Sequence, residues 1–239
     1  MNVFLPRSPD SGPDPASRGN LLAPVIRRDI ADLNRQYLAL NLEPQLRDDP
    51  RFCLSPALQS IVTDCSPEAR ERLTSCPFSL FQLHLPDPAE TSLAGGGRVA
   101  DSQAPPVLDA ATVAQCAAFA LLSISMARQI ADTQPLSPRI ALGVSAAAEA
   151  RLAGMRPSEL ARVSTWPGLI RPRWPRHERY WGMLIAAARG PDPGALQRAH
   201  CVGLCLLSGA PVSALAVPAS AARRRARTTR GPPGSGVPC

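Results

Sequence analysis

Lysine, histidine and aromatic residues are scarce in this chain of 239 residues. It contains no lysine, so all 26 basic residues are arginine, and it has only three histidines and ten aromatic side chains. An active site requires several polar groups at a recognisable spacing, and His84, His177 and His200 lie in neither an HExxH nor a GxSxG pattern. The glycine run 95–97 is not followed by the Lys-Ser/Thr pair of a phosphate loop. We therefore expect no enzyme and no cofactor.

Paired cysteines and long apolar segments are also missing. The cysteines form no CxxC motif and are odd in number: Cys53, Cys65, Cys76, Cys116, Cys201, Cys205 and Cys239. No apolar run of the secretory type stands near the start, and we find no uninterrupted apolar stretch of about 18 residues that would predict a membrane span. Reduced thiols in a cytoplasmic protein without membrane contact are the interpretation that fits.

One short segment holds three possible metal ligands, His200, Cys201 and Cys205. A structural zinc site normally adds a second ligand pair, which is not visible here. A buried cysteine usually serves as a small apolar side chain. We therefore predict no metal site.

The net charge of +7 overstates how basic the folded part is. Five of these charges belong to arginines near the end of the chain: Arg223, Arg224, Arg225, Arg227 and Arg230. The remainder carries a net charge near +2. The global charge therefore does not by itself indicate a nucleic-acid surface, and the terminal arginines form either a nonspecific phosphate-binding arm or a simple solvated tail.

The abundant prolines and glycines divide the chain. The 27 Pro and 16 Gly concentrate in three stretches, which predicts a disordered leader (1–22), a flexible linker (86–108) and a disordered tail (209–239). The remaining parts, 23–85 and 109–208, have apolar residues at spacings of three and four, as in amphipathic helices. We therefore predict an all-α protein in two parts. Within it, the segment Leu169–Trp174, which contains Pro172 and precedes Pro175, should be extended.

An internal repeat at an offset of 90 residues relates the two parts. Apolar residues, arginines and helix-starting prolines coincide without gaps at Phe52/Leu142, Leu54/Val144, Val62/Leu152, Cys65/Met155, Pro67/Pro157, Arg72/Arg162, Leu73/Val163, Pro77/Pro167 and Leu80/Ile170. Chance matching of two proline-started helices is the alternative. If the repeat is a duplication, residues 26–85 and 116–175 should show the same order of elements.

Three patches resemble the flagellar regulator subunit FlhD: the Leu-Gly step in Ala141–Val144, the segment Met155–Trp174, and the helix Ala195–Leu207 with its Leu-Gln-x-x-His motif. Residues 109–208 are thus similar to a whole FlhD-like domain, and 23–85 to a degenerate partial copy. The resemblance implies a helical, dimer-forming subunit that activates flagellar or related promoters together with an FlhC-type partner. The interchain cysteine of the family corresponds to Ile170, so that cross-link is not expected.

Two predicted helices, Ala110–Ala131 and Pro193–Ser208, carry more apolar surface than a unit of about 100 residues can cover. The interface residues that we predict are Val113, Ala117, Leu121, Ile124, Leu196, His200, Leu204 and Leu207. They would pack either in a dimer with a second copy or against helix 24–42 in an intramolecular pseudo-dimer.

Three arginines on the extended segment, Arg171, Arg173 and Arg176, are candidates for contacts with the DNA backbone. The alternative is a solvated rim. A helix-turn-helix over Leu142–Val163 is less favoured, because its second helix has few long polar residues. The function that we expect is transcriptional regulation in a complex with an FlhC-type partner at promoter DNA. The rival is a degenerate interaction paralogue that does not bind DNA.

Overall fold

The structure is a computed structural model that describes residues 24–46, 49, 54–85, 108–134, 137–166 and 168–208. The predicted leader, the predicted tail and all of the predicted linker except Leu108 lie outside the described residues. Of the described residues, 73% are helical and 4% lie in strands. The all-α class is therefore confirmed.

The first repeat unit contains α1 (Pro24–Leu42), the 3-10 turn η2 (Pro44–Leu46), α2 (Pro56–Thr63), α3 (Pro67–Thr74) and β1 (Phe81–Leu83). Each of its helices begins at a proline, whose missing N–H would have no partner in the first turn. The Ser66 hydroxyl caps α3 by accepting a hydrogen bond from the Ala69 N–H at 3.2 Å. The sequence therefore determines where these helices begin.

The second unit contains α5 (Ala110–Thr133), α6 (Ser137–Leu142), α7 (Ala146–Gly154), α8 (Pro157–Ser164) and β2 (Ile170–Pro172). It continues into α9 (Glu178–Arg189) and α10 (Pro193–Leu207). The bounds of α3 and α8 differ by 90 residues at both ends, and α2 and α7 begin 90 residues apart. The two units thus share the order of elements that the repeat predicts, apart from η2, which is much shorter than α6.

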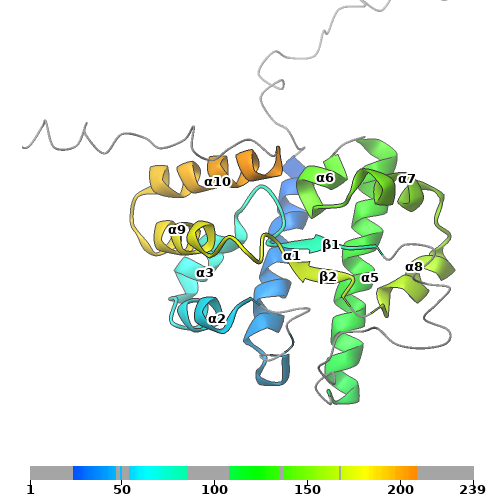
Figure 1. Ribbon diagram of the computed structural model, residues 1–239, viewed down its shortest axis with the longest axis horizontal. Helices are drawn as coiled ribbons and strands as arrows, with labels where there is room; N and C mark the ends of the chain where they lie inside the picture. Colours follow the sequence, from blue (N-terminus) through cyan, green and yellow to red (C-terminus); the bar gives the residue numbers. More distant parts are fainter. Residues whose placement is uncertain are drawn as a thin grey trace, which may run out of the picture.

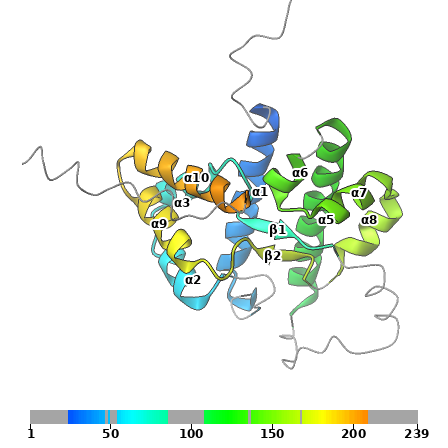
Figure 2. The same cartoon turned by 45° about the horizontal axis from the view of Figure 1, so that its top comes forward.

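The strands join the two units at the centre of the molecule. β1 pairs antiparallel with β2, with Gln82 opposite Arg171, and two further backbone hydrogen bonds extend the pairing, from the His84 N–H to the Leu169 carbonyl and from the Arg173 N–H to the Leu80 carbonyl. Figure 2 shows the strands between the α9–α10 side and the α6–α8 side. The segment predicted to be extended, 169–174, therefore contains β2.

The C-terminal helices cross from the second unit to the first. α9 packs against α2 and α3, and α10 packs against α9, so the C-terminal helices lie beside the cyan helices of the first unit (Figure 1). α1 also packs directly against α5. The buried apolar side chains of both units form one core cluster, in which the rings of Tyr37, Phe81 and Phe119 stand 5.1 to 6.3 Å apart.

Candidate functional site

A buried arginine holds the crossing of the two units together. Arg173 follows β2 and is only 1% exposed. Its guanidinium donates hydrogen bonds to the carbonyl oxygens of Ser79, Arg139, Ile140 and Ala141, at 3.0 to 3.3 Å. The acceptors belong to the segment before β1 and to α6, so one side chain connects the two units.

Aromatic rings complete the surroundings of Arg173. Its Cζ atom lies 5.7 Å from the centroid of the Phe78 ring and 5.1 Å from that of the Trp174 ring, and such contacts favour a cation. Burial lowers the pKa of Arg173 to about 9, so the guanidinium remains protonated at neutral pH. The indole N–H of Trp181 donates to the Arg173 carbonyl at 3.0 Å. Arginine is suited to such a carbonyl-lined position, because the guanidinium group has five N–H donors in a rigid fork.

The burial of Arg173 corrects its prediction as a DNA-backbone contact. Its donors face backbone carbonyls inside the protein, so no phosphate reaches them in this fold. The sequence held a signal that could have shown this: at the offset of 90, Arg173 corresponds to Leu83, which is also buried. A charged residue at a repeat position that is apolar in the other copy indicates a buried hydrogen-bonded charge as readily as a binding residue.

The other two arginine candidates lie at the surface. The Arg171 Nε donates to the Gly168 carbonyl at 3.1 Å and the side chain is exposed. Arg176 is also exposed and lines a shallow depression of about 440 Å³ over residues 175–179, together with Arg179 and Glu178. These two arginines therefore stay available to an anion.

The outer face of α10 remains partly exposed. Its inner side approaches the body closely at Gly203, where an added Cβ would overlap Phe78 Cζ and Tyr180 Oη. The predicted interface residues Leu196, Leu204 and Leu207 are half-buried, as are Val202 and Leu206. They pack against the core cluster and still present apolar surface to solvent. This placement fits a docking surface better than a closed core.

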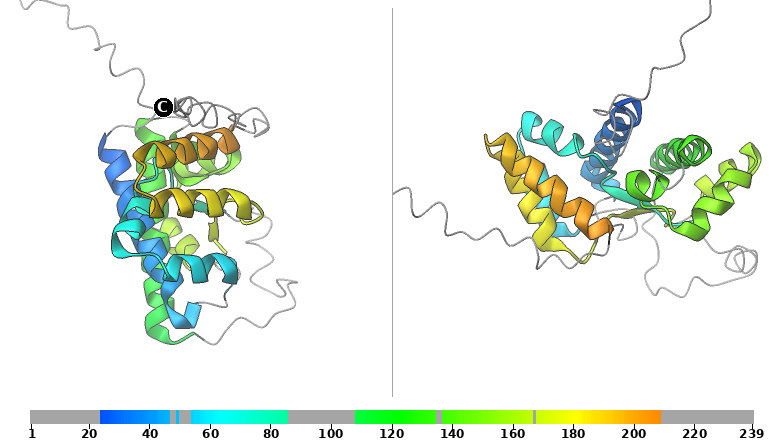
Figure 3. Two further views of the ribbon diagram at one scale, coloured as in Figure 1. Left: turned by 90° about the vertical axis from the view of Figure 1, so that its left-hand side faces the viewer. Right: turned by 90° about the horizontal axis from the view of Figure 1, so that it is seen from above.

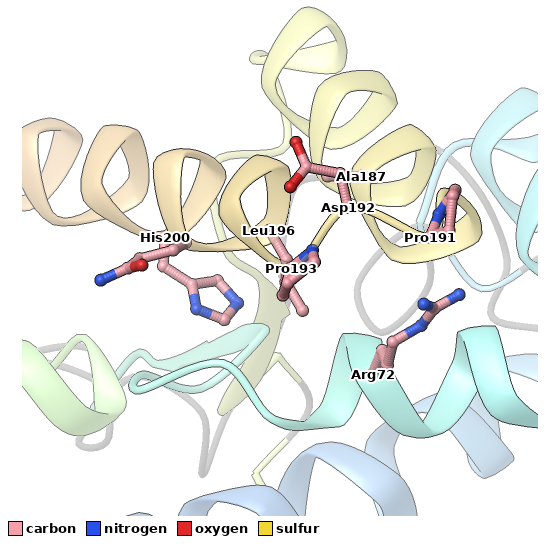
Figure 4. A pocket seen from close by; sticks show the side chains of 8 residues that line it. Arg72, Ala187, Pro191, Asp192, Pro193, Leu196 and His200 are labelled. Carbon is pink, nitrogen blue, oxygen red and sulfur yellow. The ribbon is translucent and has the colours of Figure 1, made fainter.

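A cavity of about 200 Å³ lies beside the first turns of α10. It is lined by Arg72, Ala187, Pro191, Asp192, Pro193, Leu196, Gln197 and His200. Figure 4 shows the His200 ring pointing from α10 toward α3, and Arg72 rising from α3 on the other side of the space. Its walls thus combine apolar side chains with the charged Arg72 and Asp192 and with the polar Gln197 and His200.

His200 is half-buried between α10 and the body. Its ring makes an edge contact with Phe78, with the centroids 6.3 Å apart, and its Nε2 atom has no hydrogen-bond partner among the described residues. Burial lowers the pKa of His200, so the neutral form is favoured at pH 7. His200 therefore helps to pack α10 against the body of the protein and is also partly exposed.

The predicted interface residues of α5 divide between core and surface. Ile124 is fully buried inside the molecule, so it does not face a second copy. Val113 is 51% exposed, Leu121 37% and Leu122 48%, and Ala117 is half-buried. α1 therefore packs against only one side of α5, and apolar side chains on the rest of the helix remain exposed.

The corresponding face of α1 is charged. At the offset of 90, Arg28 corresponds to Ala118, Asp32 to Leu122 and Arg35 to Ser125, and all six of these residues are exposed. Behind them the register of burial is the same, because Ile30 and Tyr37 are buried like their counterparts at 120 and 127. Sequence alone gives the apolar character of α5, but only the structure shows which of its apolar positions stay exposed.

Length and composition also make α5 a possible membrane-crossing helix. It is the one such helix among the described residues, and a third of its most apolar window is buried inside the protein. Our expectation that no stretch of this kind exists was therefore too strict, because it required an uninterrupted apolar run. Core helices of water-soluble proteins pass the same criterion.

Two other hypotheses concerned a helix-turn-helix and a metal site. The helices of the possible helix-turn-helix, α7 and α8, both pack on α5, and the exposed side of α8 is formed by Pro157, Ser158, Ala161 and Arg162. Cys201 is exposed and Cys205 half-buried. Within the described ranges no three His, Cys, Asp or Glu side chains gather in a group that could hold a metal ion.

Comparisons with protein-family models, with characterised proteins and with solved structures gave no match.

Proposed function

We propose that this chain is a regulatory subunit of the FlhD-like type, which acts in a complex with an FlhC-type partner at flagellar or related promoters. One observation carries the proposal. Two similar helical units are joined about the β1–β2 pair, with α9 of the second unit packed on α2 and α3 of the first. This interlocking is what a helical dimer needs, here within one chain. The three patches in residues 109–208 that resemble FlhD support the same function.

The outer face of α10 is the surface that we assign to the partner. Half-buried leucines occur at 204, 206 and 207 on the last turns of the helix, with Leu204 and Leu207 one turn apart on one side and Leu206 on another. Apolar residues of this kind, firmly seated and partly exposed, form the centre of many protein interfaces. The cavity beside Arg72 and His200 extends the same surface with a polar rim.

DNA contact by this chain is limited to the phosphate backbone. Exposed Arg171 and Arg176 supply two positive groups near the strand pair, and affinity for DNA grows with the number of phosphates neutralised. With a net charge near +2 outside the terminal arginines, the chain contributes positioning, and sequence readout belongs to the complex.

A second function is favoured by a specific observation. Arg173, the central member of the predicted phosphate-binding triplet, is buried. This supports an interaction subunit that has the partner surface and does not bind DNA.

The partner surface is tested by mixing the purified chain with an FlhC-type subunit and measuring the mass of the complex by light scattering. Leu206→Glu and Leu207→Glu should each weaken the complex by a factor of about 10 to 100, because each places a charge in an apolar contact. Ala161→Glu, at an exposed position on α8 away from α10, is the control and should leave the complex intact. If all three variants bind as the wild type does, α10 is not the partner surface.

A further inference from the structure

We propose that the exposed face of α5 binds a second copy of this chain, with the two α5 helices antiparallel across a two-fold axis near Ala118. The face consists of Ala111, Ala114, Ala118, Leu121, Leu122 and Ser125. No charged residue occurs from Ala110 to Ala127. At 1.5 Å per residue, the stripe from Ala111 to Ser125 runs for about 20 Å along the helix.

The contrast with α1 supports a docking role. The two helices occupy equivalent positions in the two units, and their buried residues keep the same register. At the exposed positions α1 carries Arg28, Asp32 and Arg35, of which Arg35 forms ion pairs with Asp32 and with Glu71 of α3, whereas α5 carries the uncharged Ala118, Leu122 and Ser125. If both faces were in contact only with solvent, α5 would be expected to carry polar residues at these positions as α1 does. Exposed apolar surface concentrated on one helix marks an interface.

The pattern of large and small side chains indicates a second copy as the occupant. In an antiparallel pair centred on Ala118, Leu122 of one helix lies opposite Ala114 of the other, and Ser125 lies opposite Ala111. Leu122 therefore meets Ala114 at two symmetry-related places, and Leu121 lies opposite Gln115. Small residues at the centre allow the helix axes to approach to about 8 Å. A parallel pair would set Leu122 against Leu122.

Charges at the two ends of the stripe agree with the antiparallel direction. Asp109 precedes it and Arg128 follows it, and neither makes an ion pair with another described residue. An antiparallel pair brings each aspartate to the end of the partner helix that carries the arginine. The contact uses α5, whereas the partner surface proposed above uses α10, which lies across the molecule in the view from above in Figure 3. Self-association and partner binding can therefore fail separately.

The test is the mass of the full-length chain, measured by sedimentation over a series of concentrations. We expect a reversible dimer for the wild type. Ala118→Glu should raise the dissociation constant by roughly 100-fold or more, because the two introduced carboxylates face each other at the axis. Ala118→Lys should do the same. An equimolar mixture of the two variants should restore the dimer, since opposite charges then meet. This restoration is specific to a two-fold contact at this residue.

Ala39→Glu provides the matched control, because Ala39 is an exposed alanine on α1. It should dimerise as the wild type does, and circular dichroism should show the same helix content in all the variants. A monomeric wild type, or Ala118→Glu dimers as tight as those of the wild type, would overturn the proposal. If the wild type is monomeric, sedimentation with vesicles of anionic and zwitterionic lipid would show that the face serves a membrane surface instead.

Discussion

Arg173 links the chemistry of one residue to the union of the two units. Five acceptors, four of them backbone carbonyls and the fifth the Ser79 hydroxyl, receive its donors inside the protein. Leaving a buried acceptor without a donor costs about 1–3 kcal/mol. The residue therefore matters for stability far more than for charge at the surface.

Replacing Arg173 by methionine should lower the free energy of unfolding by at least about 3 kcal/mol, because several acceptors lose their donors together. Arg173→Lys should recover only part of the loss, since an ammonium group cannot reproduce the fork of guanidinium donors. Arg171→Met, two positions earlier and exposed, should change stability by no more than about 0.5 kcal/mol. Urea unfolding of the three variants checks this, and similar losses at both positions would contradict the assignment.

His200 predicts how stability depends on pH. Because burial lowers its pKa, the unfolded chain binds a proton that the folded chain resists as the pH falls below about 6.5. Stability should therefore decrease from pH 7 to pH 5. His200→Gln should show a smaller decrease over this range, measured by urea unfolding at each pH. Carboxylates whose pKa is lowered, such as that of Glu71, affect both proteins equally and cancel in the comparison. Identical pH profiles would show that His200 does not titrate differently on folding.

At the scale of elements, the sequence predicted most of the order and little of the packing. Helix starts followed from prolines and caps, and the offset of 90 predicted that α3 and α8 would correspond. The exchange of α9 onto the first unit could not be predicted, because apolar periodicity gives the buried face of a helix and not the element that covers it. The role of Arg173 was mistaken for the same reason, because it depends on which surfaces the packing of the two units buries.

The close packing of α10 against the rest of the protein can be tested by substitutions at two glycines. Gly203→Ala should destabilise the protein by about 1–3 kcal/mol, because its Cβ overlaps Phe78 and Tyr180 in a packed contact. Gly182, inside α9, has no atom within 4 Å of an added Cβ. Gly182→Ala should therefore be stabilising by about 0.5–1 kcal/mol, since alanine favours a helix. Thermal unfolding of both variants measures the difference, and two shifts of the same sign would argue against the close approach of α10.

For the molecule as a whole, fusion of two units in one chain fixes their ratio and their orientation. The strand pair and Arg173 lie at the crossing, α10 faces one side, and the apolar stripe of α5 faces another. Such a chain suits an assembly in which each copy offers unlike surfaces to unlike partners. In the function that we propose, the exposed arginines Arg171 and Arg176 add backbone contacts to DNA that is read elsewhere in the complex.

The central claim is that this chain gains specific DNA binding only with its partner. Fluorescence anisotropy should follow a labelled promoter fragment and a scrambled fragment of equal length, titrated at several salt concentrations with the chain alone and with its complex with an FlhC-type subunit. We predict that the chain alone binds both fragments weakly, with equal affinity and strong salt dependence, and that the complex prefers the promoter. Tight, promoter-specific binding by the isolated chain, or a complex that does not discriminate between the fragments, would contradict it.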